Sequence, residues 1–458
     1  MKLNYHYHTV KTLAHYAGFD DRAAQIIAYF SQYVDEYIAR QPFVIDKKPP
    51  DFFLDNKLAV ELCKGKWVFL PCPTGVNIAN SSSHNYQIHT LMPFHFIMPA
   101  PYKEATSSAG RASYRCVTAE QGDKLLINRL IKNASGNVDA NDQSSLVALG
   151  MLLHTFADTY SHGGFSAFHG WENQSYVSIV TYNSPSKQIP FPVIRLLVWL
   201  RKKITGIERI DNAIRPMVAV ALARLPSIGH ANVGTWVDLC ECVTTFCNKD
   251  SESGKMKPIR RDMTEYMGGC SRRILNILCE ANGRPPIDDD KWEAIRDKIA
   301  DAHTVWDQGN SRLNKRIWSK KFPEISYNYK KNQFIRIKLE TLKYDKELME
   351  ELSAVSDIKK GSLAEIYSER KAVKGLMAAS DVNIRDLKNV NSDKPDTVRA
   401  AIPMSAKNVD DLFFTFSELA YRHVHQATGE YASKWDIEHL PEYCKLVSSH
   451  KRYPIFYL

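Results

Sequence analysis

Apolar residues recur every three or four positions over several stretches of the chain, which is the spacing that one face of an α-helix requires. The first stretch, Thr9 to Tyr37, carries two such runs, and Asp20 and Asp21 can cap the second run. The other stretches that predict helices are Ser144 to Phe156, Ile210 to Leu225, Trp236 to Phe246, Trp292 to Trp306 and Val409 to Ala427. The sequence therefore predicts a mainly α-helical protein.

Two long stretches, Pro71 to Glu120 and Gly163 to Pro190, lack this periodicity and predict irregular connections. Irregular segments of such length in a compact protein are usually functional or disordered. The composition changes near residue 310, where Gln308-Gly-Asn-Ser precedes a basic stretch. We therefore predict a helical core over residues 1–310 that holds the functional site, and a basic, helical C-terminal region over residues 311–458.

The composition is that of a globular protein and excludes fibrous and disordered chains. Of the 458 residues, 44% are hydrophobic and 24% are charged. The first residues contain no apolar run of signal-peptide length, and the longest apolar run, Phe191 to Leu200, is interrupted by Arg195. Nine cysteines form no disulfide framework. These features predict a cytoplasmic protein, with a peripheral membrane association as an extension of that prediction.

Most of the formal charge of +9 comes from one segment. Residues 311–347 contain eleven Lys and Arg but only four acidic residues. Aromatic residues are interleaved with them, namely Trp318, Phe322, Tyr327, Tyr329 and Phe334. This mixture suits binding to an anionic membrane surface or to nucleic acid. It is equally typical of a solvated basic edge whose aromatic residues turn into the core.

The chain contains 15 histidines, an unusual number, and some have the spacing of metal ligands. His154, Asp158 and His162 lie at positions i, i+4 and i+8 of a predicted helix, so their side chains leave from one face. The first half of this helix is apolar, and a titratable stripe on a buried face is costly unless it is paired or bound to metal. Imidazole and carboxylate suit Zn²⁺ and related divalent ions. The pattern therefore predicts a metal site.

Other residues of the same types can complete this site. His6 opens the first helix, Asp35 ends the second, and His95 lies in Pro93-Phe-His-Phe. His84 lies in the long irregular segment, and His230 is followed by Asp238 two turns later. The predicted metal ligands are His6, Asp35, His84, His95, His154, Asp158, His162, His230 and Asp238.

Several of these motifs, in this order, resemble the zinc-dependent phospholipase C superfamily, which includes single-strand nucleases. The similar pieces are Phe94-His-Phe-Ile, Leu153-His-Thr-Phe-Ala-Asp158 and Ile228-Gly-His230. A more direct likeness is to an uncharacterised bacterial family that shares Tyr-His-Tyr, Ser-Gln-Tyr-Val-Asp, Pro-Phe-His-Phe and Gly-His-Ala. The likeness consists of short motifs spread over residues 1 to 245.

The resemblance implies a multi-helix, phospholipase C-like bundle with long loops around a buried site for two or three zinc ions. It implies that Asp35 bridges two of these ions. Gly234 stands where the superfamily has a carboxylate, and Asp238 can substitute for it from the next turn. The pair His303 and Asp307 is a rival for His230 and Asp238, because it resembles a His-x-Val-Trp-Asp motif of the nucleases.

We therefore predict a metal-dependent phosphoric ester hydrolase with Asp35 and Asp158 as its catalytic residues. Phospholipid phosphodiesters are the first choice of substrate, since the apolar segment Phe191 to Lys203 with its basic end resembles an interfacial docking segment. The same segment also fits a buried helix with a basic last turn. A nuclease or nucleotide phosphodiesterase is the alternative, and a non-catalytic, metal-stabilised binding protein is the third reading.

Overall fold

The computed structural model describes residues 2–38, 43–45, 47–55, 58–63, 66–69, 72–76, 86–97, 115–121, 126–168, 170–182, 228–240, 242–250, 255–303, 311–330, 340–341 and 412–432. These residues divide into two compact units. The first takes those within Met1–Val34, Met92–Tyr329 and Gly429–Ile455, and the second takes those within Asp35–Leu91 and Lys330–Thr428. The predicted division at residue 310 is not the line between these units, and as a statement about domains it stays a prediction.

The first unit consists mainly of helices. Its elements are η1 (π-helical, Asn4–Thr9), α1 (Val10–Tyr16), α2 (Asp21–Glu36), η3 (π-helical, Gln87–His95), η4 (Ala119–Gln121), α6 (Leu126–Ser135), α7 (Gln143–Ser161), η5 (Trp171–Asn173), η7 (Gly234–Asp238), α10 (Met263–Ala281), α11 (Asp289–Ala302) and α12 (Ser311–Lys321). The last two residues of α2 and the first five of η3 fall in the second unit. The predicted mainly α-helical class is confirmed.

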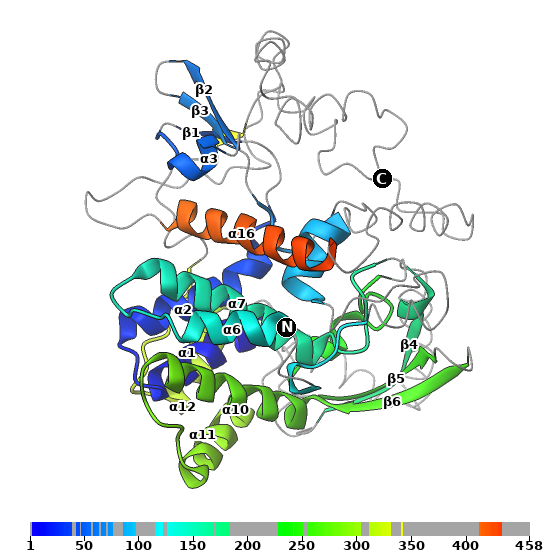
Figure 1. Cartoon of the computed structure of the whole chain (residues 1–458). Coiled ribbons are helices and arrows are strands. Elements are labelled where there is room, and N and C mark those ends of the chain that lie inside the picture. Colours follow the sequence, from blue (N-terminus) through cyan, green and yellow to red (C-terminus); the bar gives the residue numbers. More distant parts are fainter. Residues whose placement is uncertain are drawn as a thin grey trace, which may run out of the picture. The chain divides into compact units, whose positions relative to one another are not determined.

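Helix α7 is the central element of the first unit. The Asp142 side chain caps it by accepting hydrogen bonds from the Ser144 and Ser145 amides. From Leu146 to Ser161 nearly all of its side chains are buried, because α6 and α10 both pack against it. Helix α10 also contacts α1 and α11 (Figure 1). A helix that is covered on most of its faces can carry polar side chains only where they meet partners.

Three of the predicted helices that lie in the described residues are confirmed. They are Ser144 to Phe156 in α7, Trp292 to Trp306 in α11 as far as Ala302, and Val409 to Ala427 in α16 (Phe413–Ala432). The stretch Thr9 to Tyr37 forms the end of η1, α1 and α2, with a break at residues 17–20. The predicted helix Ile210 to Leu225 and the predicted docking segment Phe191 to Lys203 lie outside the described residues.

A three-stranded antiparallel sheet of the first unit was not predicted. It consists of β4 (Ser175–Tyr182), β5 (Cys242–Lys249) and β6 (Met256–Asp262) in that order, and Figure 1 shows it running away from the start of α10. The predicted helix Trp236 to Phe246 is wrong, because a 3₁₀ turn and the start of β5 occupy that segment. The β-branched run Val243-Thr-Thr favours a strand once neighbouring strands are present to pair with it.

The second unit contains a small antiparallel sheet with an aromatic core. Its strands are β1 (Phe43–Ile45), β2 (Ala59–Cys63), β3 (Lys66–Phe69) and β7 (Glu340–Thr341) in the order β2-β3-β1-β7. Helix α3 (Asp51–Asp55) and helix α16 complete it. The Phe69 ring lies 4.9 Å from that of Phe53 and 5.4 Å from that of Phe413, between ring centroids. Within the described ranges, no helix combines the length and apolarity needed to cross a bilayer.

Gly150 allows the close approach of α2 and α7. A β-carbon at this position would lie 2.4 Å from the carbonyl oxygen of Ile27, a distance that β-carbons do not tolerate. Since Ile27 belongs to α2, the glycine fixes how deeply α2 sits against α7. It thereby sets the position of the α2 backbone one turn later, at Ser31.

We predict that Gly150→Ala lowers the free energy of unfolding by about 1–3 kcal/mol, because the helices must separate to admit the methyl group. Urea unfolding followed by circular dichroism measures this change. The matched control is Gly268→Ala in α10, where a β-carbon would meet nothing closer than 3.8 Å and should improve helix stability. Equal effects of the two substitutions would contradict the prediction.

Candidate metal centre

Asp158 is the centre of a fully buried cluster of histidines. The side chain leaves α7 with no exposed surface. Its carboxylate oxygens lie 3.0 Å from His95 Nδ1, 3.2 Å from His154 Nε2, 3.3 Å from His6 Nε2 and 3.6 Å from His162 Nδ1. His154 is one turn earlier on the same helix, and His162 is the C-cap residue one turn later. The predicted one-turn spacing therefore brings these three side chains together.

Two short π-helical segments supply further donors. Element η1 carries His6, whose ring stacks on that of His154 at 3.9 Å between centroids, and η3 ends with His95. A π-helical turn changes the direction in which side chains leave the helix and is frequent at functional sites. Sequence reasoning identified both histidines but did not predict this backbone conformation, because histidine-rich segments carry no distinct signal for it.

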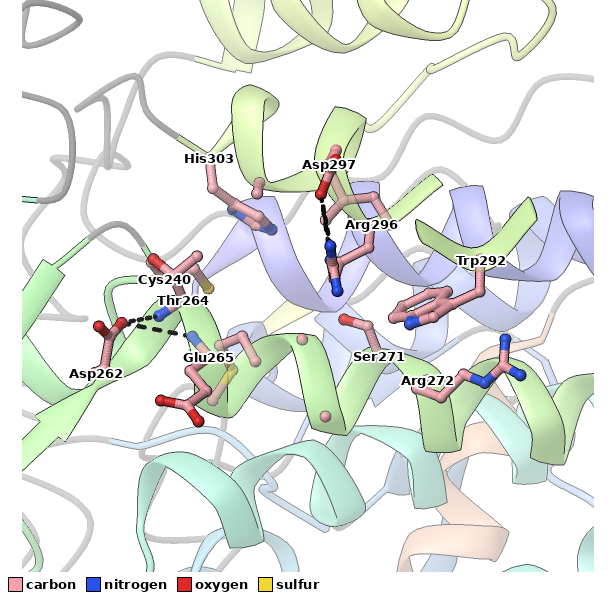
Figure 2. A pocket seen from close by; sticks show the side chains of 15 residues that line it. Cys240, Asp262, Thr264, Glu265, Ser271, Arg272, Trp292, Arg296, Asp297 and His303 are labelled. Carbon is pink, nitrogen blue, oxygen red and sulfur yellow. Dashed lines mark hydrogen bonds and ion pairs between the residues drawn. The ribbon is translucent and has the colours of Figure 1, made fainter. Parts of the chain in front are cut away.

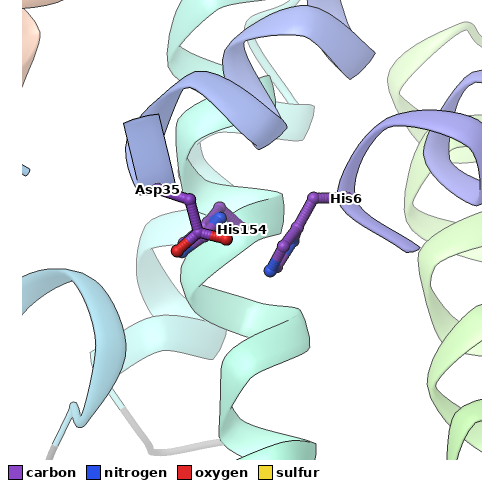
Figure 3. A group of neighbouring side chains, drawn as sticks. All are labelled: His6, Asp35 and His154. Atoms are coloured by element: carbon purple, nitrogen blue, oxygen red, sulfur yellow. The ribbon is translucent and has the colours of Figure 1, made fainter. Parts of the chain in front are cut away.

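Asp35 adds a carboxylate to the same region from the last turn of α2. Figure 3 shows His6, Asp35 and His154 directed toward one another from three different helices. Ligand atoms of these three residues lie within 4.8 Å of one another. His95, His154 and Asp158 form a second group by the same measure, so His154 is common to both. Close spacing of this kind is what binding of a divalent ion requires of its donors.

A third group lies beyond the C-terminal end of α7. It consists of His162, His230 and Asp238, again with ligand atoms within 4.8 Å of one another. Asp238, at the end of η7, lies 3.5 Å from His162 Nε2 and 3.6 Å from His230 Nε2. The His230 side chain is 18% exposed, whereas those of His6, His154 and Asp158 are fully buried. Since Asp35 of the first group is also partly exposed, solvent reaches the first and third groups more readily than the second.

Backbone carbonyl groups orient three of the histidine rings. The Nδ1–H groups donate to the carbonyls of Ser31 (from His154, 2.7 Å), His95 (from His162, 2.6 Å) and Gly234 (from His230, 2.8 Å). A carbonyl can only accept, so in its neutral form each ring carries its hydrogen on Nδ1 and has its lone pair on Nε2. Such second hydrogen bonds are the usual means of fixing the tautomer of a metal-binding histidine.

Steric crowding by Phe96 explains why a glycine precedes His230. Phe96 stacks on the His162 ring at 4.4 Å between centroids and 15° between planes. Gly229 has a φ of +49°, and a β-carbon there would lie 2.5 Å from Cζ of Phe96. Only glycine fits at this position, which places His230 beside His162 with a ring distance of 4.8 Å.

Burial and neighbouring charges prepare the donors for a cation. Burial alone would raise the pKa of Asp158, but the adjacent His162 and His154 outweigh it and hold that pKa well below the usual value. Burial lowers the pKa of His6 to about 3 and that of His230 to about 4. The carboxylate is therefore ionised and these two imidazoles are neutral near pH 7, which are the forms that bind metal.

Arg261 supports the site and was not predicted. It is buried, and its guanidinium donates to the carbonyls of Ser161 and Gly163, both at 2.7 Å. These are the residues on either side of His162, so the arginine holds the C-terminal end of α7 in place. The sequence does not reveal this role, because two arginines stand next to each other in β6. Only the structure shows that Arg261 is buried while Arg260 is exposed.

The structure brings together eight of the nine predicted metal ligands, and the ninth, His84, lies outside the described residues. The eight are His6, Asp35, His95, His154, Asp158, His162, His230 and Asp238. Of the rival pair, Asp307 also lies outside the described residues, while His303 lies elsewhere. The His303 Nε2 is 2.8 Å from Thr9 Oγ1, and its ring meets Trp318. His230, and not His303, therefore lies beside His162, and Asp238 is the carboxylate that accompanies it.

The fold and this site define a mainly α-helical protein whose buried histidine–aspartate groups can hold divalent metal. The chain belongs to a family of unknown function (DUF6765), whose model matches residues 1–429. All eight donors lie within that range. No curated protein and no solved structure matches the chain.

We predict that the metal-free protein loses stability as the pH falls below about 6.5, the value for an unfolded histidine. Because the pKa values of His6 and His230 are lowered to about 3 and about 4, the unfolded chain binds protons there that the folded chain does not. Each such histidine lowers the free energy of unfolding by up to about 1.4 kcal/mol per pH unit.

Urea midpoints of chelator-treated protein between about pH 7.5 and 4.5 measure this dependence. Asp158 does not change the stability between these pH values. Because its pKa is lowered in the folded protein, its effect on the free energy of unfolding is confined to the region below about pH 4. A midpoint that stays constant over the range would show that these histidines are not buried in the neutral form.

We also predict that Arg261→Met weakens zinc binding by about 10- to 100-fold, because the segment that carries His162 loses its two hydrogen bonds. Competition with a fluorescent chelator measures the affinity. Arg260→Met is the matched control, since the Arg260 side chain is 68% exposed. Equal affinities in both variants would argue against the supporting role.

Proposed function

We propose that this protein is a metal-dependent phosphoric ester hydrolase with a phospholipase C-like helical fold and two or three zinc ions. The observation that carries the proposal is the arrangement of three donor groups around one buried carboxylate, with His154 shared between two groups. A structural zinc site needs only four ligands around one ion. Eight adjoining donors suit several ions close together, an arrangement common among enzymes that hydrolyse phosphate esters.

The donor types fit zinc better than calcium or magnesium. Five of the eight donors are imidazoles and three are carboxylates, whereas calcium and magnesium prefer oxygen ligands throughout. When bound, such ions act as Lewis acids on a phosphoryl oxygen and lower the pKa of water. The residues that would hold them are those of the three groups described above.

The protein's own side chains have separate roles in this proposal. Asp158 stays ionised and holds the histidines around it in one arrangement, because its carboxylate is within 3.6 Å of four imidazoles. Asp35 is partly exposed, so it is the carboxylate that orients an attacking water and accepts its proton. The third group has one partly exposed donor, His230, and the proposal places the entry of a substrate phosphate there.

The substrate class is proposed to be phospholipid, with single-stranded nucleic acid or nucleotides second. One sequence argument for a membrane surface has weakened, because Trp318, Phe322 and Tyr327 of the basic stretch are buried. The Trp318 ring stacks near His8, and the Tyr327 hydroxyl meets Thr12 at 2.6 Å.

The argument from Phe191 to Lys203 stays a prediction. The same holds for the cytoplasmic location with peripheral membrane association.

A metal-stabilised binding protein without catalysis is the second candidate. The observation that favours it is the complete burial of His6, His154 and Asp158, since a structural site is closed to water. The partial exposure of Asp35 and His230 favours the hydrolase instead.

We predict that Asp35→Asn and Asp158→Asn each reduce zinc-dependent phosphodiester hydrolysis by about 100-fold or more. Release of the phosphorylated headgroup from phospholipid vesicles and cleavage of single-stranded DNA, each with zinc and with chelator, measure the activity and identify the substrate class. Asp290→Asn, at an exposed carboxylate of α11, should leave turnover unchanged. Full activity of both site variants would exclude the catalytic assignment, and no activity of the wild-type protein on either substrate would favour the binding protein.

A further inference from the structure

A second region of the first unit has the form of a ligand site. A cavity of about 590 Å³ lies between α10 and α11, and Cys240 and His303 line it as well (Figure 2). Its volume falls in the range of small-molecule sites, which is about 300–1,000 Å³. None of the eight metal-centre donors lines it.

Tyr5 contacts both the surroundings of the cavity and the metal centre. Its hydroxyl lies 3.0 Å from Oγ of Ser271, which lines the cavity, and its ring stacks on His303 at 6.1 Å between centroids. The Tyr5 ring also meets His6 edge-on at 6.3 Å between centroids. The cavity is nevertheless a site of its own, because no metal-centre donor is among its lining residues.

Gly268 keeps the cavity open on the α10 side. A glycine inside a helix destabilises it by about 0.5–1 kcal/mol relative to alanine. At Gly268 the fold gives no steric reason for this cost, since a β-carbon would meet only Cδ of Arg296 at 3.8 Å. Gly268 lines the cavity, so the missing side chain leaves a volume there that no other side chain fills. A bound ligand explains why that room is present.

The lining between the two helices is largely apolar. Met267 of α10 and Trp292 and Ile299 of α11 are buried, and Gly268 and Ala300 add small residues to the facing walls. Small residues and larger apolar residues on the two helices together suit the apolar body of a ligand that lies between them.

Charged residues lie at both ends of the cavity. Arg272, Arg296 and the exposed Asp297 lie toward one end with Trp292, whereas Asp262 and Glu265 lie at the other, by the start of α10 (Figure 2). Arg272 is held by Asp289 at 2.9 Å and lies over the Trp292 ring. Figure 2 shows Arg296 reaching from α11 toward Ser271.

Arg296 can exchange its present partners for an anion. Asp297 at 3.1 Å is 72% exposed and Glu293 at 4.0 Å is 63% exposed, and exposed ion pairs of this kind contribute little to stability. The Asp262 carboxylate is engaged by the amides of Thr264 and Glu265 at the N-terminus of α10, so it does not neutralise the arginine end.

We propose that this cavity binds a small anionic amphiphile, with its carboxylate or phosphate head on Arg296 and its apolar chain between α10 and α11. The room at Gly268 accepts the chain, and the arginine end selects the charge of the head. The proposal is independent of any activity at the metal centre.

Calorimetric titration of the full-length protein tests the proposal with four probes that share a ten-carbon chain. Decanoate and decyl phosphate, the two sources of an anionic head, should bind at one site per chain, and their relative affinity identifies the head. Decanol should bind about tenfold or more weakly, and decyltrimethylammonium not at all. Binding of the alcohol or the cation as tightly as decanoate would overturn the proposal, as would no binding of either anion.

Substitutions in the lining test whether the probe binds in the cavity. Arg296→Gln should weaken decanoate binding by about tenfold, and Gly268→Leu should abolish it by filling the space. Gly268→Ala should raise the melting temperature, because alanine stabilises the helix relative to glycine. It should also weaken binding, because the added methyl group takes up space in the cavity. Arg260→Gln, outside the cavity, is the matched control and should bind as the wild type does.

Wild-type affinity in Arg296→Gln or in a folded Gly268→Leu would overturn the proposal, and so would a lower melting temperature of Gly268→Ala. If Gly268→Leu does not fold, Arg296→Gln decides, since its side chain is 44% exposed and its replacement leaves the packing intact.

Discussion

The carboxylate of Asp158 carries a negative charge in the interior of the helical unit, and that charge has to be compensated. Four imidazoles surround it within 3.6 Å, two of them from α7 and its C-cap and one each from η1 and η3. A buried carboxylate without partners would cost several kcal/mol or take up a proton. A divalent cation among the same donors would compensate the charge directly.

Contacts from outside the cluster hold these side chains in position. Gly150 lets α2 approach α7, which brings the Ser31 carbonyl to His154 and Asp35 to the end of the cluster. Arg261 holds the backbone on both sides of His162. These contacts come from α2 and β6, elements distant in sequence from the motif on α7. The Ser31 carbonyl fixes which nitrogen His154 presents, and Arg261 fixes the backbone position of His162, so both affect whether the donors can act together.

The sequence predicts the part of this site that depends on local spacing. The one-turn intervals between His154, Asp158 and His162 follow from helix geometry, and a buried apolar helix makes a polar stripe conspicuous. The choice of His230 over His303 required the structure, because both are followed by a carboxylate and only the tertiary fold separates them. The sheet of β4, β5 and β6 was missed for the same reason, since a short apolar run does not distinguish a strand from a helix without its pairing partners.

Metal analysis of the purified full-length protein by mass spectrometry tests the central claim, that the donors around Asp158 form a centre for several ions. The account predicts about two or more zinc equivalents per chain, and loss of most of this metal in Asp158→Asn while the circular dichroism spectrum stays helical. Less than one equivalent in the wild-type protein after growth and purification with zinc, or unchanged metal in the variant, would contradict it.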